Sequence, residues 1–307
     1  NGYPVDLLPV RGFRGKSLWD SFAAIRDLGV SLRRAGGLVA SFAPDLAIGV
    51  GGYAAFPAIV AAWRQGVPIV LLEQNAAVGL TNRMLSRFAY RVCVSFAETA
   101  ETLGLRATFT GNPIRFTAPE APCHPRTDAE FRILVFGGSA GARKLNQVVP
   151  EAVGKMTTAV RVRHQAGTSE VDAVCAAYRA HGVAADVETF IEDMEEAYTW
   201  ADLVICRAGA STIAELTVLG RPAILVPYPF ATGDHQTENA RPLDAAGAAW
   251  LIPDGRLEVE DLKERLEALQ ASPERLVAAS LASRKLGRPG ALNAVVEVCM
   301  AARAGGV

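Results

Sequence analysis

The sequence predicts an α/β protein made of two units, each a parallel sheet covered by helices. Short apolar runs of strand length recur along the chain, and amphipathic segments of helix length separate most of them. This alternation is typical of parallel strands joined by helical crossovers. The chain has 307 residues, of which 50% are hydrophobic and 21% charged, enough for about two domains with sizeable cores.

Nine runs carry the strand signal, and a proline-rich stretch divides them. The predicted strands are Val5–Leu8, Leu46–Gly49, Ile69–Leu72, Arg91–Val94, Ile133–Phe136, Val160–Arg163, Leu203–Cys206, Ala223–Val226 and Ala248–Ile252. Thr110–Asp128 has several prolines and no periodic apolar pattern, which indicates a linker. We therefore expect an N-terminal domain over residues 1–115, a linker over 116–130, a C-terminal domain over 131–285, and a last helix over 286–307 that packs back toward the N-terminal domain.

The composition argues against several classes of protein. A net charge of -1 provides no global basic field for binding nucleic acid. The five cysteines are scattered without a C-x-x-C pair, so we expect reduced thiols, no metal site and no cofactor. No apolar stretch reaches the ~20 residues that a membrane-spanning helix needs.

The stretch LVFGGSAGARKLNQ, residues 134–147, places a glycine turn between a buried strand and a helix. The free N–H groups and the positive dipole end of such a helix favour a phosphate. Gly137, Gly138 and Gly141 allow close approach, and Ser139 adds a hydroxyl donor. The spacing fits neither a P-loop nor the dinucleotide fingerprint. Taken alone, the turn suits a phosphate site and a tight strand-to-helix connection equally well.

A second glycine turn, in LAIGVGGYAAFP, has the same arrangement in the N-terminal half. Gly49, Gly51 and Gly52 follow a predicted strand and precede a predicted helix. Ligands bind at the carboxyl ends of the strands in open α/β sheets. Two such turns facing each other across a cleft would suit two substrates that both carry phosphate.

Glu215 lies one turn into the predicted helix that follows the strand Leu203–Cys206. A carboxylate in this place can accept hydrogen bonds from a ribose diol. Thr212 and Glu215 also have the T-x-x-E spacing of a capping box, and the spacing alone favours the cap.

Asp234, His235, Gln236 and Asn239 lie at another predicted helix start, after the strand at Ala223. Polar side chains of this kind can recognise the hydroxyl groups of a sugar, each of which both donates and accepts a hydrogen bond. They are equally consistent with an ordinary helix start that is exposed to solvent. His235 has no cysteine, histidine or paired carboxylate at ligand spacing, which disfavours a metal.

Glu73, Gln74 and Asn75 end the strand that begins at Ile69, where a purely structural turn more often has Gly, Pro or Asp. Glu73 is a candidate general base. At the start of the linker, the guanidinium of Arg115 can reach a diphosphate.

Basic and aromatic residues gather in the N-terminal part. The first 41 residues contain six Arg or Lys against three Asp, and Trp19, Phe22 and Ile25 follow at helical spacing. Trp63 ends another apolar stretch. An amphipathic helix of this kind can lie on an anionic bilayer. More often such a stripe is part of a core.

Several strand-end motifs together resemble one family. The stretches, in family order and covering nearly the whole chain, are RGFRGK, PDLAIGVGGY, LEQNAAVGLTNR, GNPIR, FGGSAGARKLNQ, FIEDM, ADLVICRAGASTIAEL and DHQTENA. The chain thereby resembles the MurG-type glycosyltransferases, which transfer N-acetylglucosamine from its UDP donor to undecaprenyl-linked muramyl pentapeptide. The resemblance implies a GT-B fold of two facing α/β domains. It also implies an inverting transfer that converts lipid I to lipid II, with Arg115 and helix dipoles stabilising the leaving diphosphate.

The resemblance also assigns site residues. It implies that Ser139 and Arg115 bind the donor diphosphate, that Ile191 lies by the uracil, that Glu215 binds the ribose, and that Gln236 binds the sugar hydroxyls. The other implied donor residues are Asn75, Ala210, Ser211, Thr212, Ile213 and Ala214, and the implied acceptor residues are Gly51, Gly52 and Tyr53.

The family role implies peptidoglycan synthesis, and with it cell-wall biogenesis, cell shape and cell division. The implied location is the cytoplasmic face of the bacterial inner membrane, where the enzyme is peripheral. The basic and aromatic surface near Trp19 and Trp63 would contact anionic lipid.

Two features depart from the family pattern. Family members begin with a strand and a GGTGGH-type glycine loop, and this sequence has neither. The family's HEQN is LEQN here, with Leu72 in place of histidine. We therefore expect a protein of these 307 residues alone to be a poor catalyst.

Two other functions stay open at this point. One is another GT-B enzyme of UDP-sugars, such as a glycolipid synthase or a UDP-N-acetylglucosamine 2-epimerase. An epimerase needs no lipid acceptor, so the basic aromatic surface argues mildly against it. The other is a non-catalytic UDP-sugar-binding subunit.

Overall fold

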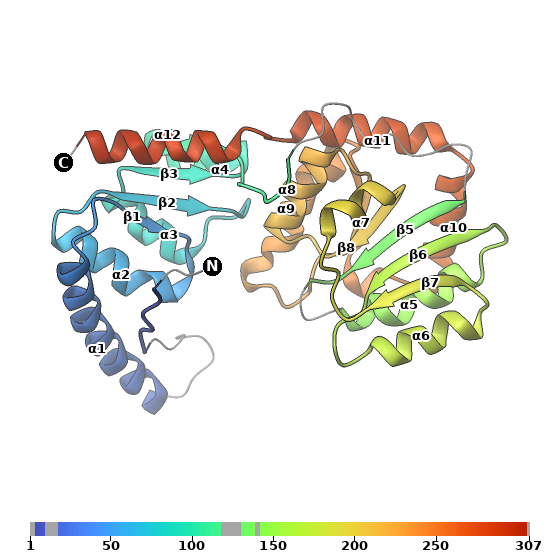
Figure 1. Ribbon diagram of the computed structural model, residues 1–307, viewed down its shortest axis with the longest axis horizontal. Coiled ribbons are helices and arrows are strands. Elements are labelled where there is room, and N and C mark those ends of the chain that lie inside the picture. The colour runs from blue at the N-terminus through green and yellow to red at the C-terminus, as the bar shows by residue number, and fades with distance from the viewer. Residues whose placement is uncertain (1–3, 10–17, 118–129, 139–141, 306–307) are drawn as a thin grey trace. The chain divides into compact units, whose positions relative to one another are not determined.

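The computed structural model describes residues 4–9, 18–117, 130–138 and 142–305. The chain divides into two compact units (Figure 1), one formed by Asn1–Asn112 with Gly290–Val307 and the other by Pro113–Pro289. The boundary between the two units lies between Asn112 and Pro113, whereas the predicted N-terminal domain extended to Arg115. Arg115 is therefore part of the second unit.

The first unit is a four-stranded parallel sheet with the strand order β1-β2-β3-β4. Its strands are β1 Ala47–Gly49, β2 Ile69–Glu73, β3 Arg91–Val94 and β4 Ala107–Phe109. Its helices are α1 Leu18–Phe42, α2 Gly52–Arg64, α3 Leu80–Leu85, α4 Ala97–Leu103 and α12 Ala291–Ala304, with 3-10 turns η1 Ser86–Phe88 and η2 Gly104–Arg106.

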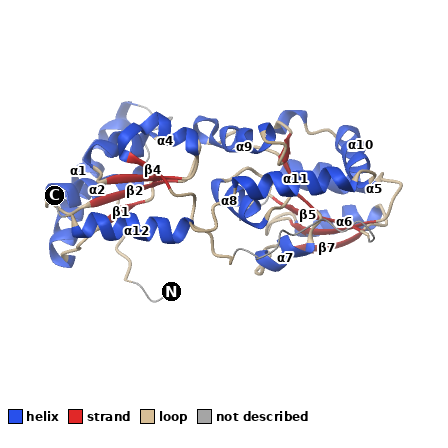
Figure 2. Ribbon diagram, turned by 90° about the horizontal axis from the view of Figure 1, so that it is seen from above, coloured by secondary structure: helices blue, strands red, loops and turns tan. Residues whose placement is uncertain are grey.

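Alternate residues of β2 point to opposite faces of this sheet, and each face has its own core. Ile69 and Leu71 pack with Ile59 of α2 on one face. Val70 packs on the other face with Val295 of α12. Figure 2 shows the strands between α12 and α4. The last helix of the chain thus completes the core of the first unit.

The second unit is a six-stranded parallel sheet with the strand order β10-β9-β8-β5-β6-β7. Its strands are β5 Phe131–Phe136, β6 Val160–Gln165, β7 Ala184–Glu188, β8 Leu203–Cys206, β9 Ala223–Leu225 and β10 Ala249–Leu251. Its helices are α5 Arg143–Gly154, α6 Val171–Ala180, α7 Met194–Trp200, α8 Ala210–Leu219, α9 His235–Ala245, α10 Val259–Gln270 and α11 Pro273–Leu286, with η3 Thr232–Asp234 and η4 Asp254–Arg256.

The alternation of β5 shows which helices cover each face of the larger sheet. Val135 belongs to the core that α5, α6 and α10 build with residues such as Leu145 and Leu266. The next residue, Phe136, faces the opposite way, and its ring lies 5.8 Å from that of Tyr198 on α7. Helices therefore cover both faces, which leaves the strand ends as the places where loops are exposed.

Three strand predictions differ from the structure. Val5–Leu8 is not a strand, because Val5 and Leu7 are about four-fifths exposed and residues 4–9 join neither sheet. The strands β4 and β7 were missed. Both are edge strands without a fully buried residue, and β7 carries Asp186 and Glu188, so neither has the apolar run on which the prediction depended.

Candidate functional site

Because all six strands of the second unit are parallel, their carboxyl ends meet at one edge of the sheet, and the segments that follow them lie there together. The glycine turn follows β5, Ile191 follows β7, the start of α8 follows β8, and Gln236 follows β9. Residues from well-separated parts of the sequence are thus brought to one edge.

The turn after β5 begins with Gly137 and Gly138 and leads into α5. Gly138 has φ +97°, a left-handed conformation that L side chains rarely adopt, so this position needs glycine. Helix α5 begins after Ala142, and among the described residues the side chain at this N-cap provides no acceptor for the first N–H groups of the helix. Ser139 and Gly141 lie outside the described residues.

Gln165, the last residue of β6, connects the turn after β5 to the segment after β7. Its side chain is 3% exposed. Its Nε2 donates to the carbonyl oxygen of Gly138 over 2.9 Å, and its Oε1 accepts from the N–H of Ile191 over 3.0 Å. Gln165 was not among the predicted site residues. The available signal was an amide side chain at the carboxyl end of an otherwise buried strand.

Helix α8 begins three residues earlier than a capping box at Thr212 would require. Its N-cap is Gly209, which is extended and has no side-chain cap, so Thr212 lies inside the first turn instead of preceding it. The capping-box prediction for Thr212 and Glu215 is therefore wrong. Of the residues implied for the nucleoside, Ser211 is exposed, Ala210, Thr212 and Ala214 are half-buried, and Ile213 is buried.

Glu215 is half-buried, and one of its oxygens is held by a neighbouring helix. Tyr198 on α7 donates its hydroxyl to Oε2 over 2.9 Å. Burial raises the pKa of Glu215, while the hydrogen bond from Tyr198 and the positive charge of exposed Arg115 oppose that rise. Burial also raises the pKa of Tyr198. Tyr198 therefore stays a hydrogen-bond donor, and the other oxygen of Glu215 is not committed to it.

Gln236 lies at the start of α9 with its oxygen facing the protein. Oε1 accepts from the backbone N–H groups of Ala208, over 3.2 Å, and Tyr228, over 2.9 Å. The group that Gln236 can offer to a ligand is therefore its amide nitrogen, a donor. Asn239, one turn further on, is fully buried and donates to the carbonyl oxygen of Ala208.

Arg207 fixes the chain immediately before α8. Its side chain is buried, and Nη1 donates to the carbonyl oxygens of Val226 and Pro227 over 3.1 and 3.0 Å. The same group pairs with Asp254 over 2.5 Å. Arg207 thus ties the turn after β8 to the loop after β9, a role that the sequence pattern did not reveal.

In the first unit, the glycine turn after β1 leads into α2. Gly51 and Gly52 have φ +83° and +73°, and a Cβ on Gly51 would lie 3.1 Å from Nδ2 of Asn82. Tyr53 is 54% exposed, and α2 has no side-chain cap. The three residues implied for the acceptor thus surround an uncapped helix start.

Glu73 and Asn75 lie at the end of β2, and the loop that follows closes around Glu73. The carboxylate is 3% exposed. Oε1 accepts from the backbone and side-chain nitrogens of Asn75, and Oε2 accepts from the N–H of Gly79, over 2.9 Å, and from Nδ2 of Asn82, over 3.0 Å. This arrangement favours a structural role for Glu73 over that of a general base.

His164 is also structural. It is fully buried on β6 between Tyr178 and Asn146, and burial lowers its pKa to about 3. Within the described part of the chain, no group of three or more His, Cys, Asp or Glu side chains is arranged to hold a metal ion. None of the described helices is long and apolar enough to cross a membrane.

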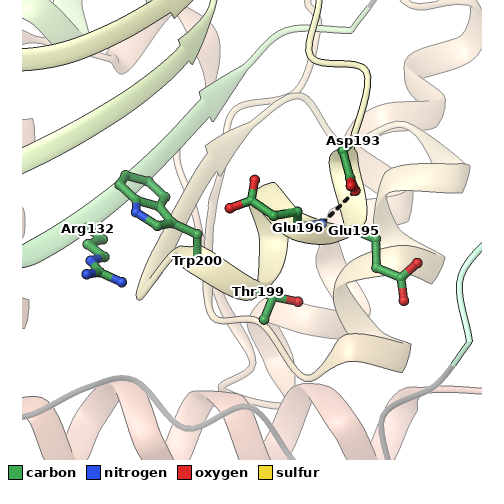
Figure 3. A pocket seen from close by; sticks show the side chains of 6 residues that line it. All are labelled: Arg132, Asp193, Glu195, Glu196, Thr199 and Trp200. Carbon is green, nitrogen blue, oxygen red and sulfur yellow. Dashed lines mark hydrogen bonds between the residues drawn. The ribbon is translucent and has the colours of Figure 1, made fainter.

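A pocket of about 480 Å³ lies beside α7 (Figure 3). Arg132, near the amino end of β5, places its guanidinium 5.7 Å from the ring centre of Trp200. The other lining residues are Asp193, Glu195, Glu196 and Thr199. Arg132 and Trp200 lie toward the amino end of β5. The pocket therefore does not coincide with the carboxyl edge of the sheet, where Glu215 and Gln236 lie.

The two parallel-sheet units, each with loops at its strand ends, have the architecture of the GT-B fold. Residues 132–294 match the glycosyltransferase family 28 C-terminal domain, and residues 1–94 match the corresponding N-terminal domain. The chain belongs to glycosyltransferase family 28, among the MurG-type transferases.

Several relatives are closely similar. The UDP-N-acetylglucosamine–N-acetylmuramyl-(pentapeptide) pyrophosphoryl-undecaprenol N-acetylglucosamine transferase of Alkalilimnicola ehrlichii is 45% identical over 97% of this chain and 84% of its own. Its counterpart in Aeromonas hydrophila is 42% identical over 97% and 83%.

Solved structures agree with the sequence comparison. The crystal structure of Acinetobacter baumannii MurG matches with a TM-score of 0.79 and 32% identity, over 95% of this chain and 83% of that one. A putative UDP-N-acetylglucosamine 2-epimerase from Listeria monocytogenes matches with a TM-score of 0.68 at 15% identity, over 94% and 81%, and supports the fold alone.

Proposed function

We propose that this protein transfers N-acetylglucosamine from UDP-N-acetylglucosamine to undecaprenyl-diphospho-N-acetylmuramyl-pentapeptide, converting lipid I to lipid II. The names of the relatives at 45% and 42% identity support this activity. The observation that carries the proposal is the meeting of Ile191, Glu215 and Gln236 at one edge of the sheet, after β7, β8 and β9.

Each part of the donor has a matching group at that edge. The uracil lies beside Ile191, the ribose diol donates to Glu215, and the amide nitrogen of Gln236 donates to a sugar oxygen. The diphosphate lies against the glycine turn and Arg115, with Ser139 as an added hydroxyl donor. Residues 210–214 form the wall beside the nucleoside.

The first unit supplies the acceptor side. We assign the lipid diphosphate to the start of α2 at Gly51, Gly52 and Tyr53, because its uncapped N–H groups suit an anion. Asn75 faces the donor in this proposal, and Glu73 holds Asn75 in place through two hydrogen bonds.

The chemistry is a single displacement. The acceptor hydroxyl oxygen attacks the anomeric carbon, the bond from that carbon to the UDP oxygen breaks, and the configuration inverts. A general base takes the proton of the hydroxyl. Arg115 and the dipole at the start of α5 stabilise the negative charge that develops on the departing diphosphate.

We also propose that the first unit docks on the cytoplasmic leaflet of the membrane. Trp63, Leu80 and Met84 are 46%, 75% and 44% exposed, and the Trp63 ring packs on Phe88. Exposed arginines lie near them in the sequence: Arg64 on α2, Arg83 on α3 and Arg87 on η1. Apolar side chains beside arginine favour an anionic interface.

Calorimetric titration with UDP-N-acetylglucosamine, UDP-glucose and UDP-N-acetylgalactosamine tests the donor site. We expect UDP-N-acetylglucosamine to bind most tightly. The matched variant is Gln236→Glu, which keeps an oxygen for Ala208 and Tyr228 but loses the amide donor. It should lose the preference between sugars and retain affinity for UDP. Equal binding of the three donors by the unaltered protein would overturn the sugar assignment, and transfer to a lipid I analogue tests the reaction itself.

A further inference from the structure

We propose that Gln165 is a positioning residue that holds the phosphate-binding turn and the base-binding segment in register. The inference rests on the proposed function, because it concerns the same donor site. Gln165 touches no part of the donor in this proposal and acts through Gly138 and Ile191.

The position of Gln165 in the sheet makes this possible. It is the last residue of β6, the strand between β5 and β7, and it is in register with Phe136 on one side and Glu188 on the other. The chain leaves the sheet immediately after both neighbours. A side chain at this point can reach both loops.

The two hydrogen bonds fix the orientation of the amide. The carbonyl oxygen of Gly138 requires a donor, and the N–H of Ile191 requires an acceptor, so Nε2 and Oε1 cannot exchange places without losing both bonds. Gln165 and Ile191 are 3% and 1% exposed. Water therefore does not readily replace either bond, and each loop constrains the other through one rigid planar group.

The bond to Gly138 also bears on anion binding. A carbonyl oxygen carries partial negative charge and would repel a diphosphate if it faced outward. Gln165 holds this oxygen toward the buried interior. Gly138 at φ +97° provides the backbone conformation in which the turn can do so.

The test compares two variants with a matched control. Gln165→Met keeps the approximate volume and removes both bonds. Gln165→Glu keeps an acceptor for Ile191 and removes the donor to Gly138. The control is Gln270→Met, which also removes two side-chain hydrogen bonds, one donated to the carbonyl oxygen of Ala159 and one accepted from the Thr158 hydroxyl, at the amino edge of the same sheet.

The readouts are calorimetric affinity for UDP and for uridine, thermal unfolding, and amide hydrogen exchange at Ile191 in the ligand-free protein. We expect Gln165→Met to bind UDP at least about tenfold more weakly, to bind uridine more weakly, and to exchange Ile191 faster. Gln165→Glu should lose UDP affinity but keep uridine affinity, since uridine is neutral, and keep slow exchange at Ile191. The control should match the unaltered protein in both affinities.

Three other results would overturn either the role of Gln165 or the donor site itself. UDP affinity within twofold of the unaltered protein in Gln165→Met would overturn the inference and leave the donor site standing. If that variant does not fold, UDP affinity within twofold in Gln165→Glu overturns it in the same way. Failure of the unaltered protein to bind UDP at millimolar concentration would overturn the donor site, and the inference with it.

Discussion

Glu73 in the first unit is the last residue of β2, and Glu215 in the second lies on the helix that follows β8, so both lie near the carboxyl end of a parallel strand, yet their surroundings differ. Four hydrogen bonds, from the loop after β2 and from Asn82 on α3, occupy both oxygens of Glu73. Glu215 has one oxygen held by Tyr198 from another helix. A carboxylate with all its acceptor positions occupied organises the chain around it, whereas one held on a single side is oriented for a ligand. The same substitution should therefore have different effects at the two places.

The largest effect is expected from Glu73→Gln. An amide NH₂ would replace one oxygen and face N–H donors in a buried site, leaving at least one of them without an acceptor. We expect the free energy of unfolding to fall by about 3 kcal/mol. Denaturant unfolding measures this, with Glu101→Gln, at an exposed position of α4, as the control. A loss no larger than that of the control would remove the structural role assigned to Glu73.

The next effect is on ligand affinity at Glu215. Hydrogen bonds to a charged group contribute about 1.5–3 kcal/mol, so Glu215→Gln should weaken UDP by about tenfold or more. The ribose assignment is tested with 2′-deoxy-UDP, which should bind the unaltered protein and the variant with nearly equal affinity. An undiminished effect of the substitution on 2′-deoxy-UDP would show that Glu215 acts elsewhere than on the diol.

A smaller effect is expected from pH. Burial raises the pKa of Glu215 above its ordinary 4.5, so the carboxylate protonates at a higher pH than an exposed one. Affinity for UDP-N-acetylglucosamine should fall as pH drops through that raised value. The diphosphate of this ligand is esterified at both ends and keeps its charge over the range. Tyr198→Phe removes a hydrogen bond that stabilises the carboxylate, so in this variant the midpoint of the fall in affinity should lie at a higher pH. Glu215→Gln should show no such midpoint, and an identical midpoint in Tyr198→Phe would contradict the assigned bond.

The smallest effect is on stability at Glu215. A folded-state pKa above the unfolded value means that ionisation opposes folding, fully so above the raised pKa and not at all below 4.5. Glu215→Gln should therefore raise the free energy of unfolding slightly at neutral pH. The gain should disappear as pH falls through the raised pKa toward 4.5. Unfolding curves at several pH values measure this difference in the free energy of unfolding between Glu215→Gln and the unaltered protein. A difference that grows as the pH falls would contradict a raised pKa of Glu215.

The sequence predicted the elements whose signal is local. The buried strand at Ile133–Phe136 and the glycine turn after it follow from a run of apolar residues and three glycines, and the structure places β5 there. β7 escaped prediction because it is an edge strand without a fully buried residue. Its position depends on pairing with β6. The spacing of apolar residues along the sequence, which reveals strands and helices, does not reveal such pairing between distant segments.

The site shows the same limit. Gln236 could be named from its place after a strand, but the direction of its amide depends on Ala208, 28 positions earlier. The capping box at Thr212 failed because Gly209 starts the helix sooner than the spacing suggested. Gln165 and Arg207 were not predicted because each bonds to backbone groups of distant segments. Every residue has a backbone carbonyl oxygen, so the sequence does not indicate which of them accepts such a bond.

The packing of α12 onto β2 and β3 has a consequence for folding during synthesis. The ribosome makes residues 113–289 as one continuous stretch, so the second unit can fold as soon as that stretch has emerged. The first unit cannot bury Val70 and Cys93 until Val295 and Ala302 have been made, more than two hundred residues later. The half of the protein that is made first should therefore be the last to become stable, and a nascent chain arrested before residue 290 should show protease resistance in the second unit earlier than in the first.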